Sequence, residues 1–170
     1  DVYKRQLNLL SHFREVAKDT GASMTLFLSG LFLLPRAKKD FYHPPRHAIG
    51  ASDIGYLEDH DIHATIKNIG QAWTEGHEIG THFNGHFCGP TGVSKWSPAD
   101  WRSEIEQAKQ FVENWRTNTG FTDLPPLPFD YEKELIGGRT PCLEGADNLR
   151  VTASKLCLLY TSDAADERSS

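Results

Sequence analysis

Residues 76–86 read Gly76-His77-Glu78-Ile79-Gly80-Thr81-His82-Phe83-Asn84-Gly85-His86. The pattern predicts a short strand over 78–81 that leads directly into two histidines spaced four residues apart. Side chains at positions i and i+4 project to the same side of a helical turn, or of a tight loop that mimics one. Two imidazoles placed in this way form a common half-site for catalytic zinc. Any third ligand has to come from elsewhere in the chain.

The segments before this stretch alternate between helix and strand. Helical spacing of apolar residues predicts a helix over 7–19 and a second helix over about 60–75, with glycines where the two helices should end. The apolar residues concerned are Leu10, Phe13, Val16 and Ala17 in the first helix, and Ile62, Ile66, Ile69 and Trp73 in the second. Residues 24–28 form an apolar run that suits a buried strand of a parallel sheet. This alternation predicts an α/β sheet or barrel whose functional residues lie at the C-terminal strand ends.

A further helix begins at Ser97-Pro98-Ala99-Asp100, which is a capping box with proline at the first helical position. Its predicted buried face consists of Trp101, Ile105, Ala108, Val112 and Trp115, and Gly120 is the expected C-terminal cap. Prolines and glycines predict irregular loops over 35–53 and 124–128.

Composition restricts the class of protein. The 170 residues are 38% hydrophobic and 24% charged, which suits one globular domain with no membrane span. A formal net charge of -5 without a basic run argues against nucleic acid as a partner. The sequence does not address the oligomeric state.

The two ends resemble a translated sequencing-library adapter. Residues 1–6, Asp-Val-Tyr-Lys-Arg-Gln, match one orientation of that adapter, and residues 157–170 begin with a match to the opposite orientation. We therefore expect 1–6 and 157–170 to be non-native, and 7–156 to be part of a catalytic domain.

Two motifs and one strand resemble the polysaccharide deacetylases that share the NodB homology domain, carbohydrate esterase family four. Residues 82–86 are similar to the second motif of that family, His-Ser/Thr-x-x-His, and Arg139-Thr140-Pro141 is similar to its third motif, Arg-x-Pro. Thr25-Leu26-Phe27-Leu28-Ser29-Gly30 is similar to the Thr-Phe-Phe-x-x-Gly segment that precedes them. Phe83 and Cys142 depart from the family, which usually has Ser or Thr and an aromatic residue at these positions.

The resemblance implies a distorted (β/α) barrel that contains a divalent metal, with zinc as the expected ion. His82 and His86 would be metal ligands together with an aspartate, Arg139 would orient a second aspartate that acts as the base, and Asn84, Pro141 and Cys142 would contact substrate. The two aspartates and the acid histidine of the family would lie outside residues 7–156, so this chain alone is expected to be inactive. The implied substrate is an N-acetylated or O-acetylated polysaccharide such as chitin, peptidoglycan or an exopolysaccharide, and the implied location is secreted or cell envelope.

These residue types suit amide hydrolysis. A divalent metal lowers the pKa of bound water to about 7 and polarises the carbonyl group. An arginine is always charged and can bind a carboxylate through two parallel hydrogen bonds, which suits Arg139 as the group that holds an ionised base in place.

Three alternatives stay open. The chain could be a structural zinc module that uses His82, His86, Cys88 and Cys142, a non-catalytic carbohydrate-binding relative, or a cyclic-amide hydrolase of the same superfamily. Cys88 and Cys142 follow the second and third motifs closely, so both would line one pocket. Because members of the family often function outside the cytoplasm, we expect a disulfide between them.

Overall fold

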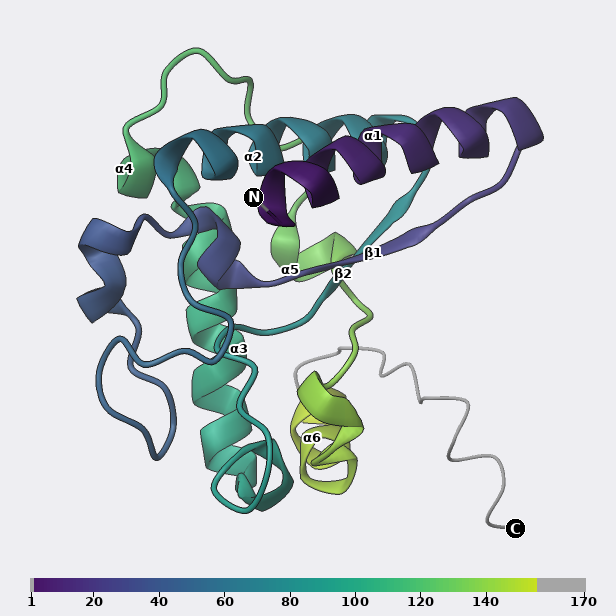
Figure 1. Ribbon diagram of the computed structural model, residues 1–170. Coiled ribbons are helices and arrows are strands. Elements are labelled where there is room, and N and C mark those ends of the chain that lie inside the picture. Colours follow the sequence, from purple (N-terminus) through teal and green to yellow (C-terminus); the bar gives the residue numbers. More distant parts are fainter. Residues whose placement is uncertain (1, 156–170) are drawn as a thin grey trace, which may run out of the picture.

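The computed structural model describes residues 2–155, and the predicted adapter residues 157–170 lie outside this range (Figure 1). The helices and strands follow one another as α1 (Val2–Thr20), β1 (Thr25–Leu28), α2 (Asp59–Thr74), β2 (Glu78–Thr81), α3 (Pro98–Glu113), α4 (Trp115–Thr119), α5 (Tyr131–Glu134) and α6 (Ala146–Lys155). Short 3-10 turns occupy Gly30–Leu33 (η1), Arg36–Phe41 (η2), Val93–Lys95 (η3) and Pro141–Leu143 (η4). Because α1 begins at Val2, it includes residues that we assign to adapter, and that assignment stays a prediction.

The sheet consists of two parallel strands, in which Thr25 of β1 lies opposite Glu78 of β2, and Leu28 lies opposite Thr81. An isolated parallel bridge joins Thr81 to Gly138, so a third segment lies beside β2. The prediction of a mixed α/β fold with parallel strands is therefore confirmed in outline. Residues 2–155 do not form a barrel.

Two groups of buried side chains hold these elements together. The first lies between the sheet, α2 and α3, and includes Leu28, Ile62, Ile66, Ile79, Ala108 and Val112. The second packs around the other end of α3 and the loop after β2, and includes Tyr42, Phe83, Phe87, Trp96, Trp101 and Leu149. Because α3 contributes to both groups, it is the element that joins the sheet to the loops.

The predicted start of α3 is confirmed. The Ser97 hydroxyl accepts a hydrogen bond from the backbone N–H of Asp100, and the Asp100 carboxylate accepts one from the backbone N–H of Ser97 at 2.8 Å. All five residues of the predicted apolar face are buried, but the predicted helix is interrupted at Asn114, so Trp115 belongs to α4. Gly120, with φ 75°, ends the short helix α4 that follows.

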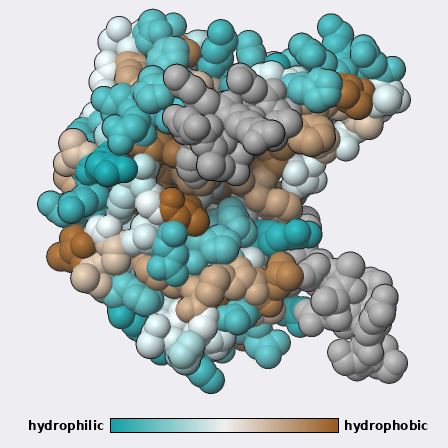
Figure 2. Space-filling view, in the orientation of Figure 1, coloured by the Kyte–Doolittle hydropathy of each residue, from teal (hydrophilic) through white to brown (hydrophobic). Residues whose placement is uncertain are grey.

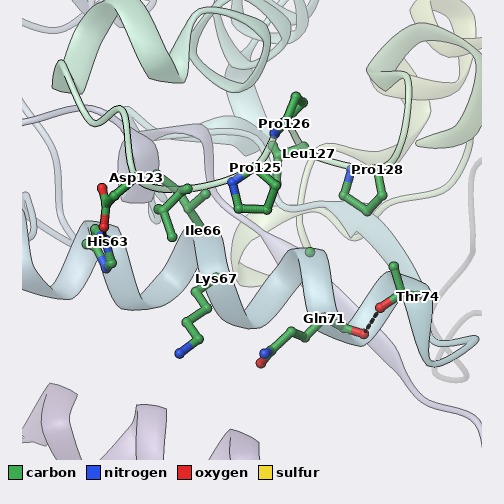
Figure 3. A pocket seen from close by; sticks show the side chains of 12 residues that line it. His63, Ile66, Lys67, Gln71, Thr74, Asp123, Pro125, Pro126, Leu127 and Pro128 are labelled. Carbon is green, nitrogen blue, oxygen red and sulfur yellow. Dashed lines mark hydrogen bonds and ion pairs between the residues drawn. The ribbon is translucent and has the colours of Figure 1, made fainter.

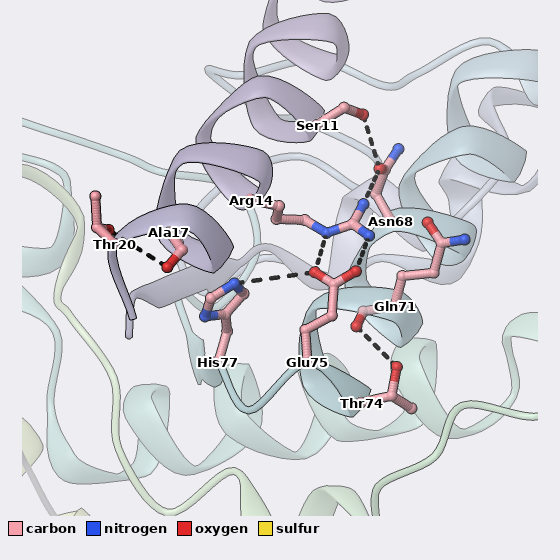
Figure 4. A network of polar contacts seen from close by, with 9 residues as sticks. All are labelled: Ser11, Arg14, Ala17, Thr20, Asn68, Gln71, Thr74, Glu75 and His77. Carbon is pink, nitrogen blue, oxygen red and sulfur yellow. Dashed lines mark hydrogen bonds and ion pairs between the residues drawn. The ribbon is translucent and has the colours of Figure 1, made fainter. Parts of the chain in front are cut away.

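The helix α1 packs mainly on α2, and the two run side by side in Figure 1. Between them, the Arg14 guanidinium of α1 binds the carboxylate of Glu75, the C-cap of α2, and also donates a hydrogen bond to Asn68 (Figure 4). The helix predicted over 7–19 lies within α1, but Phe13 and Val16 of its apolar positions are 54% and 44% exposed. With α2 as its main neighbour, α1 can bury only one narrow stripe of its surface.

On the face seen in Figure 2, hydrophilic residues cover much of the surface and strongly hydrophobic residues stand in separate places. No helix within residues 2–155 combines the length and apolar character that crossing a lipid bilayer requires.

Candidate metal centre

The C-terminal end of β2 brings two loops together. The backbone N–H of Thr81 donates to the carbonyl of Gly137 at 2.9 Å, and the backbone N–H of Arg139 donates to the carbonyl of Thr81 at 3.0 Å. The histidine loop (residues 82–86) and the arginine loop (residues 139–143) therefore start side by side. This position, at the C-terminal end of a parallel strand, is the one that the sequence predicts.

His82 and His86 face one another, with their ring centroids 5.0 Å apart. The Nδ1 atom of His82 lies 2.8 Å from the carbonyl oxygen of Arg139. A carbonyl oxygen can only accept, so Nδ1 carries the proton and Nε2 keeps its free lone pair. Histidines that bind a metal through one ring nitrogen usually donate a hydrogen bond from the other ring nitrogen to a backbone carbonyl or a carboxylate, and this bond orients the ring.

Burial lowers the pKa of His82, and the nearby His86 and Arg139 charges act in the same direction. The hydrogen bond to the Arg139 carbonyl opposes this shift. The net result favours the neutral imidazole, which is the form that binds a metal ion.

The guanidinium of Arg139 lies over the ring of Phe27, 5.2 Å from its centroid, and the His82 ring lies 6.3 Å from the same ring. Phe27 on β1 is therefore flanked by both predicted site residues. Within residues 2–155, no carboxylate forms an ion pair with Arg139. Over the same range, no aspartate or glutamate joins His82 and His86 in a cluster of potential metal ligands.

Cys88 and Cys142 form a disulfide with their Cα atoms 5.8 Å apart, which confirms the predicted pairing. The bond joins the segment after the histidine loop to the arginine loop. The Nδ1 atom of His86 lies 3.9 Å from the sulfur of Cys88 and 3.8 Å from that of Cys142.

Four residues of these loops have left-handed backbone conformations although none is glycine. They are Phe83, His86, Cys142 and Leu143, with φ between 58° and 59°. Such conformations cost of order 1–3 kcal/mol each and concentrate at functional sites, where the surrounding structure enforces them.

Glu104 of α3 holds the histidine loop from behind. Its carboxylate accepts hydrogen bonds from the backbone N–H of Asn84 at 3.0 Å and of Gly85 at 3.4 Å, and from the hydroxyl of Tyr42 at 3.0 Å. The carbonyl of Asn84 accepts a further bond from the hydroxyl of Ser29 at 2.9 Å. The loop conformation is thus fixed by groups from three other parts of the chain.

Two residues expected to contact substrate are buried. Asn84 is completely buried, and its side-chain amide donates to the backbone carbonyl of Glu104 at 3.0 Å. Pro141 is also buried, at the start of η4. Their placement gives both residues a structural role and does not support contact with substrate, whereas Cys142 lies partly exposed in the disulfide.

Glu104 is a residue that the sequence reasoning missed. A signal was available, since Glu104 lies three residues after Trp101 and four before Ala108, on the predicted apolar face. A carboxylate in that position is buried by the geometry of the helix and requires hydrogen-bond partners.

A cavity of about 550 Å³ lies between α2 and the proline-rich loop before α5 (Figure 3). Ile66, Leu124 and Leu127 line it together with the polar residues His63 and Lys67. None of the predicted site residues borders it, so it is separate from the two-histidine arrangement.

Comparison of this chain with protein-family models, curated proteins and solved structures finds no match.

Proposed function

We propose that this chain carries part of the active site of a metal-dependent hydrolase that removes N-acetyl or O-acetyl groups from a polysaccharide. One observation carries the proposal: His82 and His86 face each other at the end of β2, while the carbonyl of Arg139 fixes the His82 ring. The histidine pair and the Arg-x-Pro segment belong to the two motifs whose resemblance suggested this chemistry, and they meet at one end of the sheet.

In the proposed mechanism, His82 and His86 would hold a divalent cation through their ring nitrogens, with zinc as the expected ion. When bound, such an ion supplies a nucleophilic water and polarises the acyl carbonyl. The arginine loop orients His82 through its backbone, and the Arg139 guanidinium is available to bind and align a carboxylate base. The base, the third protein ligand and the acid would come from outside residues 7–156.

The proposed fold is a distorted (β/α) barrel of the NodB type. The parallel pairing of β1 with β2 and the parallel bridge at Gly138 support a larger parallel sheet around these elements. A secreted or cell-envelope location is also proposed, and the Cys88–Cys142 disulfide supports it because such bonds persist in oxidising compartments.

The disulfide argues against the alternative of a structural zinc module. A four-ligand site needs the thiolates of Cys88 and Cys142, and the bond between their sulfurs removes both donors. In the disulfide-bonded form, the two histidines are the remaining ligands of that set. This arrangement favours an open catalytic site over a closed structural one.

The test is acetate release from an N-acetylglucosamine oligomer, measured with this segment in its natural flanking sequence and with zinc supplied. His82→Ala and His86→Ala should each lower kcat/KM by at least about 100-fold. Arg139→Lys keeps the charge but loses the bidentate geometry, so it should lower kcat by about 10-fold or more.

The matched control is His60→Ala, since the His60 side chain is 61% exposed and belongs to α2. This variant should behave as the wild type. Equal activity in the His82→Ala, His86→Ala and wild-type proteins would rule out the proposed roles. Absence of activity from the wild type and from every variant would favour a non-catalytic carbohydrate-binding relative.

A further inference from the structure

Three potential soft-metal ligands lie together beside the histidine pair. The Nδ1 atom of His86 and the sulfurs of Cys88 and Cys142 all lie within 4.8 Å of one another. Cys88 is exposed, while His86 and Cys142 are partly buried. The cluster is therefore open to small solutes from solvent.

Two of the three distances between the ligand atoms of this cluster are already close to those of a tetrahedral metal site. With zinc–nitrogen bonds of about 2.0 Å and zinc–sulfur bonds of about 2.3 Å, a tetrahedral ion places nitrogen and sulfur ligands roughly 3.6 Å apart. The Nδ1 atom of His86 lies 3.9 Å from the sulfur of Cys88 and 3.8 Å from that of Cys142. Only the two sulfurs have to separate, to roughly 3.8 Å in the same geometry.

We propose that reduction of the Cys88–Cys142 disulfide creates a second metal site, in which His86 Nδ1 and both cysteine sulfurs bind one thiophilic divalent cation such as zinc. Three protein ligands leave one coordination position open to water. The site shares His86 with the two-histidine arrangement, but it does not depend on the deacetylase assignment, because its test measures zinc binding and His82 and Arg139 are not among its ligands.

A dithiol is the reductant, and it supplies the two electrons that the disulfide needs. One thiolate of the dithiol attacks a cysteine sulfur and forms a mixed disulfide, and the second thiol then displaces that cysteine, so the dithiol leaves as its own disulfide. Two electrons pass to the cysteines, which become thiols. Binding of the cation to both sulfurs releases two protons to solvent.

Each cysteine lies on its own loop, Cys88 after the histidine loop and Cys142 in the arginine loop, so no shared helix or strand holds the two sulfurs together once the bond is broken. Separation of the sulfurs needs rotation of the two side chains, because a Cα separation of 5.8 Å does not hold the sulfur atoms in contact once the bond is broken.

The experiment compares zinc binding by the oxidised and reduced forms of the 170-residue chain, by competition with a chromophoric chelator. The reduced form is prepared with excess dithiol and desalted without oxygen. The reduced chain should bind one zinc at least about 100-fold more tightly than the oxidised chain. Cobalt(II) in place of zinc should give a thiolate-to-metal charge-transfer band in the reduced chain alone.

Variants assign the ligands. Cys142→Ser removes the bond and one thiolate, so it should abolish the gain in affinity on reduction. His86→Ala keeps both thiolates and should lower the gain by about 10-fold or more, while His60→Ala on α2 should retain it in full. If Cys142→Ser does not fold, the reduced wild type gives the same information: zinc should protect the thiols of Cys88 and Cys142 from alkylation and leave Cys157 reactive, as located by peptide mass spectrometry. Equal zinc affinity of the two forms, or a gain of the same size in His86→Ala as in the wild type, would overturn the proposal.

Discussion

At the scale of single residues, Glu104 connects the core to the histidine loop. Its carboxylate accepts hydrogen bonds from the hydroxyl of Tyr42 and the backbone of Asn84 and Gly85. Burial raises the pKa of Glu104 to about 7, against the lowering effect of these hydrogen bonds. The Glu104 carboxyl group therefore changes charge near neutral pH, and it is the group that binds the backbone of the histidine loop.

This raised pKa predicts a pH-dependent stability. The folded chain holds a proton on Glu104 up to about pH 7, whereas the unfolded chain releases it near the ordinary pKa of 4.5. The stabilising contribution is therefore complete below pH 4.5 and is lost as the pH rises to 7. The difference corresponds to about 3 kcal/mol in the free energy of unfolding.

The measurement is urea unfolding of the wild type and Glu104→Gln at a series of pH values from 4.5 to 8. The glutamine variant cannot titrate, so the free energy of unfolding of the wild type should fall relative to it as the pH rises. Glu106→Gln, on the exposed side of the same helix, is the control and should follow the wild type. Parallel pH curves for the wild type and Glu104→Gln would contradict the raised pKa.

At the scale of elements, the capping box of α3 offers a local test. The hydroxyl of Ser97 accepts from the backbone N–H of Asp100, a bond that alanine cannot replace. Ser97→Ala should lower the free energy of unfolding by about 1 kcal/mol. Ser103→Ala, at an exposed position inside the same helix, should be neutral or slightly stabilising because alanine has the higher helix propensity. Equal effects of the two substitutions in denaturant unfolding would argue against the cap.

The disulfide joins two loops that are far apart in the chain. Cys88 and Cys142 are separated by 54 positions, so the bond restricts a long loop of the unfolded chain. Reduction should lower the free energy of unfolding by about 4 kcal/mol, measured by urea unfolding with and without reductant in the presence of a chelator. A midpoint that does not change on reduction would show that the loops are held together by other contacts.

The elements that the sequence predicts well are those set by local rules. The strand β1 and the start of α3 follow from neighbouring residues alone, through the apolar run over 24–28 and through Ser97 with Asp100. The exposure of Phe13 and Val16 and the burial of Asn84 depend on which elements pack against them. That information lies in tertiary contacts, which helical periodicity does not contain.

At the scale of the whole molecule, the candidate site forms where three distant segments meet. The end of β2, the arginine loop and the middle of α3 converge on the histidine loop. The sequence predicted the convergence of the first two, because it placed both motifs at strand ends. It did not predict that the side chain of Arg139 would stack on Phe27, which depends on the register of β1 against β2.

The most direct test of the central claim is a titration of the oxidised 170-residue chain with cobalt(II) and zinc, followed by optical spectroscopy and calorimetry. We predict one bound ion per chain, with affinity reduced by about 10-fold or more in both His82→Ala and His86→Ala and unchanged in His60→Ala. We expect the wild type to bind the ion weakly, because the described residues supply two ligands to this site, His82 and His86. Affinities that are the same in the wild type, His82→Ala and His86→Ala would contradict the assignment of a metal site to this pair.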